Sequence, residues 1–332
     1  MKRIFSGVKP TGHLTLGNYL GAVRRWVEVD QHRSDALFSV VDLHALTVEH
    51  DPARVRRLSR QAATLLLAAG LDPKLCTVFV QSHVDEHARL SYLLECTATD
   101  GELRRMIQYK EKGARARAAG ESVRLSLLTY PVLMAADILA YGTEEVPVGE
   151  DQTQHVELTR DLAVRFNQRY GHVFTVPKAT HPEVAARVMD LQDPGSKMGK
   201  SHENGAGIVY LLDDADAVRR KIMRAVTDSG RDVVYDREAS PGVANLLDLL
   251  AASTGGNPEA LAGVYESYGS LKRDTADAVV EMLRPVRERH AELAADPGHV
   301  DGVLRDGAER AREMARPLVD RAYRAIGLLP AG

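Results

Sequence analysis

Strand-length and helix-length segments alternate over the first 80 residues, and this alternation constrains the fold more than any other feature. Short apolar runs of strand character lie at residues 4–6, 36–41 and 76–80. Apolar residues at helical spacing over 16–27 separate the first two runs, and a helix predicted to begin at Asp51-Pro52 and to end at Gly70 separates the last two. Strands that alternate with helices form a parallel sheet through right-handed crossovers. We therefore predict an α/β fold with a doubly wound parallel sheet, which binds ligands at the carboxyl ends of its strands.

The second half of the chain has a different pattern. Helical segments at 122–141 and 151–170, with a short strand or loop at 146–149, lie between the two regions. After Ser201, apolar periodicity punctuated by glycine and proline predicts helices at 213–227, 243–254, 261–268, 271–292 and 300–326. A chain of 332 residues accommodates about two domains. We expect a smaller helical domain to follow the α/β domain.

Composition excludes several classes of protein. Hydrophobic residues make up 44% and charged residues 27% of the chain, which is typical of a soluble globular protein and excludes a disordered chain or a coiled-coil rod. The most apolar stretch, 125–139, is interrupted by polar residues and a proline, so no membrane span is expected. The N-terminus lacks the apolar segment of a signal peptide, and two cysteines are too few for a disulfide framework. These features predict a cytoplasmic protein that does not contact membranes.

The segment 102–124 is locally basic, although the net charge of −3 provides no general attraction for nucleic acid. Seven lysine or arginine residues stand there against three glutamates. Such a segment could hold phosphate groups, but a solvated helical arm is the more common explanation of a charge run.

Two glycine-containing loops are candidates for nucleotide binding. The first, 10–18, joins the first predicted strand to its helix, where Gly17 lets a flat ring approach the backbone and the helix N-terminus offers N–H groups to phosphate. The second, 194–201, lies between the domains, and its Lys197 and Lys200 could clamp a polyphosphate. The alternatives are an ordinary strand-to-helix turn and a mobile linker with solvated lysines.

Asp137 lies in the apolar helical segment, where an unpaired carboxylate would be costly. Either it pairs with a donor inside the protein, or it receives a donor from a ligand. A structural ion pair is the more frequent of these two solutions.

Other motifs lack the context that their chemistry requires. His83 and His87 are spaced like two metal ligands, but no third ligand accompanies them, so no metal site is predicted. Ser6-x-x-Lys9 lacks the companion motif of an acyl-serine enzyme. Gly205-Ala206-Gly207 does not follow a strand, as a dinucleotide-binding motif would.

Taken together, the motifs resemble the bacterial tryptophanyl-tRNA synthetases, a class I aminoacyl-tRNA synthetase family, along essentially the whole chain. Residues 15–18 (TLGN) are similar to the HIGH motif of that family, and 197–201 (KMGKS) to its KMSKS loop. The combination of 134–137 (MAAD) with 149–152 (GEDQ) is more specific. Matching segments also lie at 4–7, 10–12, 41–45 and 128–131.

The resemblance implies a particular division of the chain. Its parts are a Rossmann-like catalytic domain over 1–195, a KMSKS-type loop and hinge over 196–204, a helical domain that binds the tRNA anticodon over 205–297, and a final helix over 298–332 that packs back on the catalytic domain.

The resemblance also implies the reaction and its residues. L-tryptophan is activated with ATP and Mg²⁺ to tryptophanyl-adenylate and pyrophosphate, and is then transferred to the 3′ end of tRNA(Trp). The implied catalytic residues are Lys197, Lys200, Ser201 and Asn18. The implied ATP-binding residues are Lys9, Pro10, Thr11, Gly17, Asn18, Glu150, Asp151, Gln152, Val188, Lys197, Met198, Gly199, Lys200 and Ser201. The implied tryptophan-binding residues are Phe5, Gly7, Val40, His44, Tyr130, Met134, Asp137, Val146, Val148 and Gln152.

Within this set, Asp137 is expected to accept the indole N–H, which tyrosine and phenylalanine cannot supply at that position. The resemblance further implies a homodimer, and no metal held by protein side chains is expected.

Two positions depart from the family pattern. Lys9 stands where a neutral side chain, usually glutamine, is expected, and Gly199 replaces the central serine of the KMSKS loop. Since Lys197 and Lys200 remain, we expect activity to persist with altered contacts to ATP or Mg²⁺. Lys9 could also change the response to tryptophan-like inhibitors.

Two other functions remain open at this point. A tyrosyl-tRNA synthetase has the same fold and reaction, but recognition of a phenol would need more polar partners than the segment around Asp137 offers. A disabled relative could serve as a tryptophan sensor, but the retained Lys197, Lys200 and Asn18 argue against it.

Overall fold

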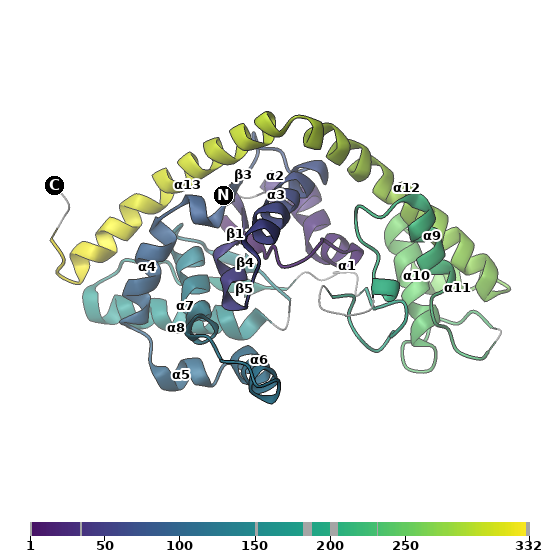
Figure 1. Ribbon diagram of the computed structural model, residues 1–332, viewed down its shortest axis with the longest axis horizontal. Coiled ribbons are helices and arrows are strands. Elements are labelled where there is room, and N and C mark those ends of the chain that lie inside the picture. Colours follow the sequence, from purple (N-terminus) through teal and green to yellow (C-terminus); the bar gives the residue numbers. More distant parts are fainter. Residues whose placement is uncertain are drawn as a thin grey trace.

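A five-stranded parallel sheet forms the centre of the larger half of the molecule (Figure 1). The computed structural model describes residues 2–33, 35–149, 152–181, 188–199, 205–230 and 232–329. The strand order is β3-β2-β1-β4-β5, with every pair parallel. The strands are β1 (Arg3–Val8), β2 (Asp35–Val40), β3 (Thr77–Val80), β4 (Glu145–Pro147) and β5 (Lys178–Thr180). The order reverses at β1, which is typical of a doubly wound sheet and confirms the predicted fold class.

Helices surround the sheet and make up the other half of the molecule. The α-helices are α1 (Leu16–Asn18), α2 (Gln31–Arg33), α3 (Pro52–Ala68), α4 (Glu86–Glu95), α5 (Asp100–Arg104), α6 (Ile107–Ala118), α7 (Leu125–Leu139), α8 (Thr153–Tyr170), α9 (Ala215–Met223), α10 (Pro241–Thr254), α11 (Pro258–Ala262), α12 (Tyr268–Ala295) and α13 (Pro297–Ala325). Most bounds agree with the predicted segments to within a few residues.

Two predicted helices differ from those observed. The segment predicted over 16–27 begins as α1 but continues through the π-helical turns Tyr19–Val23 and Trp26–Asp30. The helix predicted over 261–268 is displaced, because Asn257 caps α11 through its Oδ1, which accepts from the Ala260 N–H at 2.9 Å, and Pro258 takes the first helical position.

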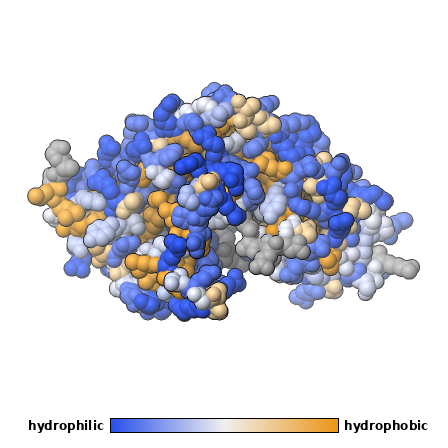
Figure 2. All heavy atoms as spheres, in the orientation of Figure 1, coloured by the Kyte–Doolittle hydropathy of each residue, from blue (hydrophilic) through white to orange (hydrophobic). Residues whose placement is uncertain are grey.

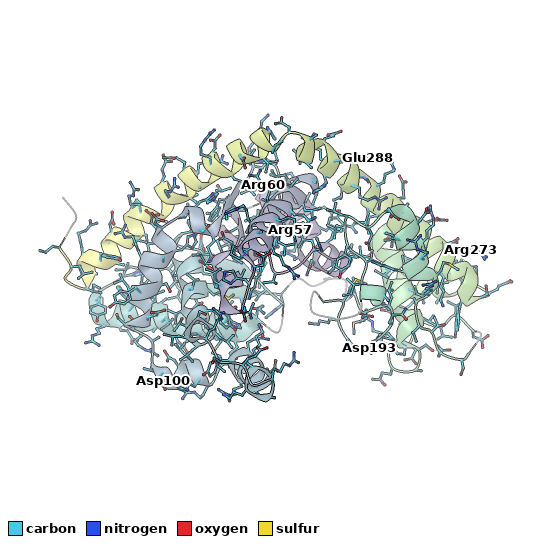
Figure 3. The ribbon with its side chains drawn as sticks, viewed as in Figure 1. Arg57, Arg60, Asp100, Asp193, Arg273 and Glu288 are labelled. Atoms are coloured by element: carbon cyan, nitrogen blue, oxygen red, sulfur yellow. The ribbon has the colours of Figure 1, made fainter. Side chains whose placement is uncertain are left out.

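The two halves are joined by one long helical path. From the helical half, where it packs on α9 and α10, α12 runs to α3 beside the sheet, and α13 continues over β3 and α4 (Figure 1). The Glu288 side chain extends from the outer side of this path (Figure 3), and Arg60 of α3 forms an ion pair with Asp301 of α13 at 2.8 Å.

The hydrophobic core extends across both halves. On one side of the sheet, Trp26 and Phe38 belong to a buried cluster that continues into the helical half through residues such as Leu246 and Leu283. A second cluster contains Phe5 and covers the other side with α7, α8 and α13. None of the helices in the described ranges combines the length and hydrophobicity that a transmembrane span needs.

Gly307 is the point at which α13 crosses the sheet. A methyl group at this position would overlap the carbonyl oxygen of Val78 in β3. We predict that Gly307→Ala lowers the free energy of unfolding by about 3 kcal/mol, because neither backbone can move away without disturbing the core. Chemical denaturation measures this change. In the same helix, a Cβ at Gly302 has its nearest neighbour 3.8 Å away, so Gly302→Ala should leave stability unchanged or raise it slightly. Equal effects of the two substitutions would contradict the close crossing.

Candidate functional site

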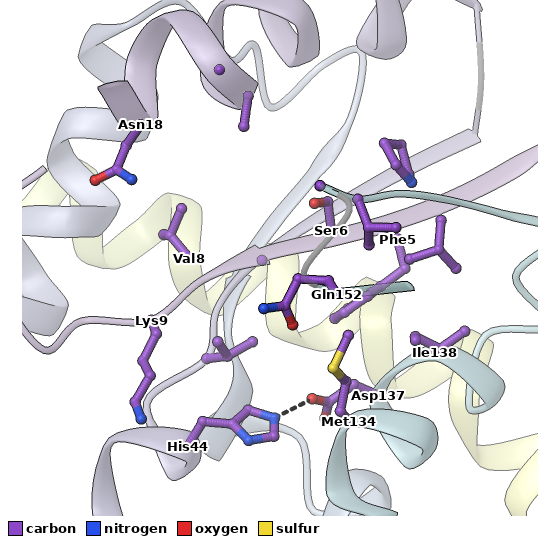
Figure 4. Close-up of a pocket in the computed structure, with 18 of the residues that line it drawn as sticks. Phe5, Ser6, Val8, Lys9, Asn18, His44, Met134, Asp137, Ile138 and Gln152 are labelled. Carbon is purple, nitrogen blue, oxygen red and sulfur yellow. Dashed lines mark hydrogen bonds and ion pairs between the residues drawn. The ribbon is translucent and has the colours of Figure 1, made fainter. Parts of the chain in front are cut away.

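A cavity of about 570 Å³ opens at the carboxyl ends of the central strands. Its walls come from β1 and the turn after it, from α1, α6 and α7, and from the residues that follow β2 and β4. Parallel α/β sheets bind ligands at this edge. In Figure 4, Lys9 and Asn18 lie on one side of the cavity, and Phe5, Met134, Asp137 and Ile138 lie on the other.

Most of the predicted site residues meet in this cavity. Those that line it are Phe5, Gly7, Lys9, Thr11, Gly17, Asn18, His44, Tyr130, Met134, Asp137, Val146, Val148 and Gln152. Pro10, Val40, Val188, Lys197, Met198 and Gly199 are not among its lining residues. Glu150, Asp151, Lys200 and Ser201 lie outside the described residues.

Val40 is a correction to the predicted set. It is fully buried in the core cluster that contains Trp26, whereas its neighbour Val41 lines the cavity. Successive side chains in an extended chain point to opposite faces, so the two valines cannot both reach the same space.

The apolar end of the cavity contains a buried carboxylate, Asp137, which is 1% exposed. His44 Nε2 lies 2.8 Å from its Oδ2 (Figure 4), and His87 Nδ1 lies 2.6 Å from its Oδ1. Gln81 Nε2 lies 2.7 and 2.8 Å from the two oxygens. Since an ionised carboxylate only accepts hydrogen bonds, all three groups donate to it. The structural pairing that the sequence left open is therefore present.

The carboxylate of Asp137 accepts two hydrogen bonds at each oxygen and also lines the cavity. Because Gln81 Nε2 contacts both oxygens, a donor from a ligand would share or replace that contact. Burial acts to raise the pKa of Asp137, but attraction to and hydrogen bonds from His87 and His44 outweigh it and lower the pKa to about 2. Asp137 is thus ionised at neutral pH and can accept a charge-assisted hydrogen bond from a ligand in the cavity.

Gln81 and His87 are functional residues that sequence reasoning missed. Both follow β3, and His87 is fully buried with its Nε2 2.7 Å from the hydroxyl of Tyr141. His87 stood out in the sequence only as an unlikely metal ligand. Its pairing with Asp137 depends on how β3 and α7 meet, which no local pattern reveals. Within the described residues, no cluster of acidic, cysteine or histidine side chains could hold a metal ion.

The wall next to Asp137 also has ordered polar partners. The Tyr130 hydroxyl lies 2.7 Å from His155 Nε2, and the Tyr130 ring meets the His44 ring edge-on at 6.2 Å. These contacts hold the Tyr130 ring at the side of the cavity. The Gln152 side chain also faces the cavity (Figure 4).

The opposite end of the cavity is cationic. Lys9 Nζ donates to Thr47 Oγ1 at 3.1 Å, and Lys112 of α6 lines the same space. Burial and, to a smaller extent, the charge of Lys112 lower the pKa of Lys9 to about 8. Lys112 belongs to the basic segment that we expected to be a solvated arm; it is exposed, as that explanation predicts, and it also lines the cavity.

The first glycine loop is held in place by a reciprocal cap. The Thr15 hydroxyl accepts from the Asn18 N–H, and Asn18 Oδ1 accepts from the Thr15 N–H, both at 3.2 Å. Since Oδ1 is engaged, Asn18 offers its amide Nδ2 to a ligand in the cavity.

The second loop folds as a hairpin over residues 188–198, which we call the phosphate-loop hairpin. Met189 and Lys197 face each other in an antiparallel bridge. Val188 and Met198 are buried in the core, and a Cβ at Gly17 would lie 2.9 Å from the Met198 carbonyl oxygen. The hairpin therefore packs directly against the first glycine loop, with Lys197 exposed at its surface.

Comparison with known proteins agrees with this geometry. Residues 1–284 match the family model of class I tRNA synthetases for tryptophan and tyrosine (W and Y). The chain is 81% identical over 331 residues to tryptophan–tRNA ligase 1 of Streptomyces avermitilis, with 100% of both chains covered. The chain belongs to the tryptophanyl-tRNA synthetases, class I enzymes that ligate tryptophan to tRNA. It is 49% identical to tryptophan–tRNA ligase 2 of the same organism, over 99% of this chain and 98% of the other.

Solved structures of this family have the same architecture as this synthetase. Tryptophanyl-tRNA synthetase from Mycoplasma pneumoniae superposes with a TM-score of 0.91 at 35% identity, covering 99% of this chain and 98% of the other. The enzyme from Campylobacter jejuni, in a complex with ADP and tryptophan, superposes with a TM-score of 0.84 at 33% identity, covering 98% and 100%.

The pKa of Lys9 gives a prediction for ATP binding. A bound triphosphate favours the protonated lysine, so binding should take up protons near pH 8, and ATP affinity should fall as the pH rises from 8 to 10, by up to ~10-fold per pH unit. Lys9→Gln should lose most of this dependence. Isothermal titration calorimetry at constant ionic strength measures it. Lys110→Gln, on the exposed side of the same basic segment, should retain the wild-type profile. The same profile in Lys9→Gln would show that Lys9 does not contact the nucleotide.

Proposed function

We propose that this synthetase activates L-tryptophan with ATP and transfers it to the 3′-terminal adenosine of tRNA(Trp). The observation that carries this proposal is a single cavity with an apolar wall around the ionised Asp137 at one end and Lys9 and Lys112 at the other. An indole with an N–H group suits the first end, and a polyphosphate suits the second. The volume of about 570 Å³ lies within the range of ligand sites.

The first step joins the two ends of the cavity. A carboxylate oxygen of tryptophan attacks the α-phosphorus of ATP, the bond to the β-phosphate bridging oxygen breaks, and pyrophosphate leaves with that electron pair. In the second step a ribose hydroxyl of tRNA attacks the aminoacyl carbonyl carbon, and AMP leaves. Such transfers need positioning and charge stabilisation more than a protein nucleophile.

The tryptophan subsite is proposed as follows. Asp137 accepts the indole N–H, and Tyr130 and Gln152 hold the α-amino group. The remaining walls are Phe5, Gly7, His44, Met134, Val146 and Val148, with Val41 in the place that we had assigned to Val40. A substrate without a donor at the indole position cannot make this hydrogen bond to Asp137.

The nucleotide subsite is proposed at the cationic end. Gly17 lets the adenosine approach the backbone, and Asn18, Thr11 and Lys9 face its phosphates. Lys197 and the segments 150–152 and 198–201 complete the nucleotide subsite. Lys197 and Lys200 close on the departing pyrophosphate. Val188 and Pro10 support the subsite from beneath. Mg²⁺ enters bound to the ATP phosphates and offsets part of their charge.

We also propose the domain roles and the assembly. The catalytic domain spans 1–195, the loop and hinge 196–204, and the helical anticodon-binding domain 205–297, while 298–332 returns to the catalytic domain. We propose that the enzyme is a cytoplasmic homodimer. Exposed apolar residues support a partner surface, because Tyr92, Ile107 and Leu125 are 66%, 55% and 73% exposed on α4, α6 and α7, and hydrophobic residues reach the surface around α7 and α8 (Figure 2).

Exchange of labelled pyrophosphate into ATP tests this function. We predict exchange that depends on tryptophan, with a kcat/KM higher than that for phenylalanine or tyrosine by on the order of 10⁴, because a hydrogen-bonding site rejects analogues that leave it unpaired. The assay needs no tRNA, so it isolates the first step. A tryptophan sensor without catalysis would show no exchange, and equal exchange with tyrosine would contradict the assigned specificity.

A further inference from the structure

The Asn245 side chain makes two hydrogen bonds to the backbone of one residue of the phosphate-loop hairpin. Its Oδ1 accepts from the Met189 N–H at 2.9 Å, and its Nδ2 donates to the Met189 carbonyl oxygen at 3.0 Å. Asn245 lies on α10 in the helical half and is 3% exposed. A carboxamide carries the same donor and acceptor as a peptide group, so Asn245 pairs with Met189 as an adjacent strand would.

Met189 stands directly opposite Lys197 across the hairpin. The flanking hydrogen bonds run from the Met198 N–H to the Val188 carbonyl oxygen, at 3.0 Å, and from the Asp190 N–H to the Ser196 carbonyl oxygen, at 2.9 Å. Because these bonds flank the Met189–Lys197 pair, the N–H and C=O of Met189 point away from Lys197. Asn245 takes both of these outward groups.

The rest of the outer edge of the hairpin is also bonded to the helical half. The Leu191 N–H donates to the Gly207 carbonyl oxygen at 2.9 Å, and the Leu191 carbonyl oxygen accepts from the Val226 N–H at 2.7 Å. Asp193, at the turn of the hairpin, lies beside the helical half in Figure 3. Toward the sheet, the hairpin makes the packing contact between Met198 and Gly17. The helical half therefore determines where the strand that carries Lys197 lies.

We propose that Asn245 is a positioning residue for adenylate formation, which sets the place of Lys197 through the backbone of Met189. The inference rests on the proposed role of Lys197 at the pyrophosphate end of ATP. Asn245 touches neither substrate. A displacement of about 1 Å at a group that contacts the reacting phosphates can slow a reaction by about 100-fold, so a fixed strand matters more for the rate than for binding.

The site allows this role to be tested without unfolding the protein. A second cavity, of about 310 Å³, is lined by Asn245 together with Met189, Pro194 and Gly195. When the carboxamide is removed, water can reach the Met189 N–H and C=O from this space and satisfy them. Water molecules satisfy these groups but do not fix the position of the strand. The side chain of Asn245 does fix it, because it belongs to a packed helix.

Asn245→Ala should lower kcat for pyrophosphate exchange by about 10- to 100-fold, while the Kd for tryptophan changes less than twofold, because its subsite lies on other elements. Asn245→Asp keeps the shape of the side chain and its acceptor but removes its donor, so it should also slow exchange. If Asn245→Ala does not fold, Asn245→Asp provides the test of the positioning role. The matched control is Asn257→Ala, which removes a helix cap in the same half without touching the hairpin. It should keep wild-type kcat. Wild-type kcat in both Asn245 variants would overturn the inference.

A double-mutant cycle with Lys197→Ala separates positioning from general destabilisation. If Asn245 acts through Lys197, Asn245→Ala should slow Lys197→Ala by less than twofold. Independent, multiplicative effects would overturn the inference, even if both single variants are slow. Full activity in Lys197→Ala would overturn the proposed role of Lys197 and this inference with it. A slow Lys197→Ala beside fast Asn245 variants would overturn the inference alone.

Discussion

The buried carboxylate of Asp137 is the interaction on which the catalytic half depends. Its donors come from the ends of two neighbouring strands, since His44 follows β2 and Gln81 and His87 follow β3, while Asp137 itself lies on α7. A buried charge is tolerated only when such partners surround it, and removing one of the partners from a buried pair is costly. The carboxylate therefore fixes α7 against the sheet and forms one wall of the cavity. In the proposed function, this structural group also selects the substrate.

The cationic end of the cavity has the opposite character. Lys9 and Lys112 both line this end, and each has a lowered pKa for which burial is the main cause. An anion bound near the two lysines favours their charged forms. The protein thus provides an ionised acceptor at one end and two lysines at the other. A substrate pair of an indole amino acid and a triphosphate complements both ends.

Local patterns in the sequence were sufficient for the parallel sheet and for most of the site. Strand-to-helix alternation predicted β1, β2 and β3, and the resemblance predicted most of the residues that line the cavity. Contacts between distant segments were not predictable. The hydrogen bonds of Gln81 and His87 to Asp137 and the pairing of Asn245 with Met189 join residues that are 56, 50 and 56 positions apart. Lys112 likewise lines the cavity beside residues that are far from it in the sequence. Val40 was misassigned because an error of one residue along an extended chain moves a side chain to the opposite face.

The proposed specificity rests on a hydrogen bond from the indole N–H to Asp137, which shares or replaces the contact from Gln81. It is tested most directly by the affinity of an isosteric tryptophan analogue in which sulfur replaces that N–H group. The analogue differs from tryptophan in this one donor, so the comparison isolates one charge-assisted hydrogen bond. We predict a Kd about 10- to 100-fold higher than that of tryptophan, measured by calorimetry under identical conditions. Equal affinities for the two ligands would contradict the account and would leave Asp137 with a structural role only.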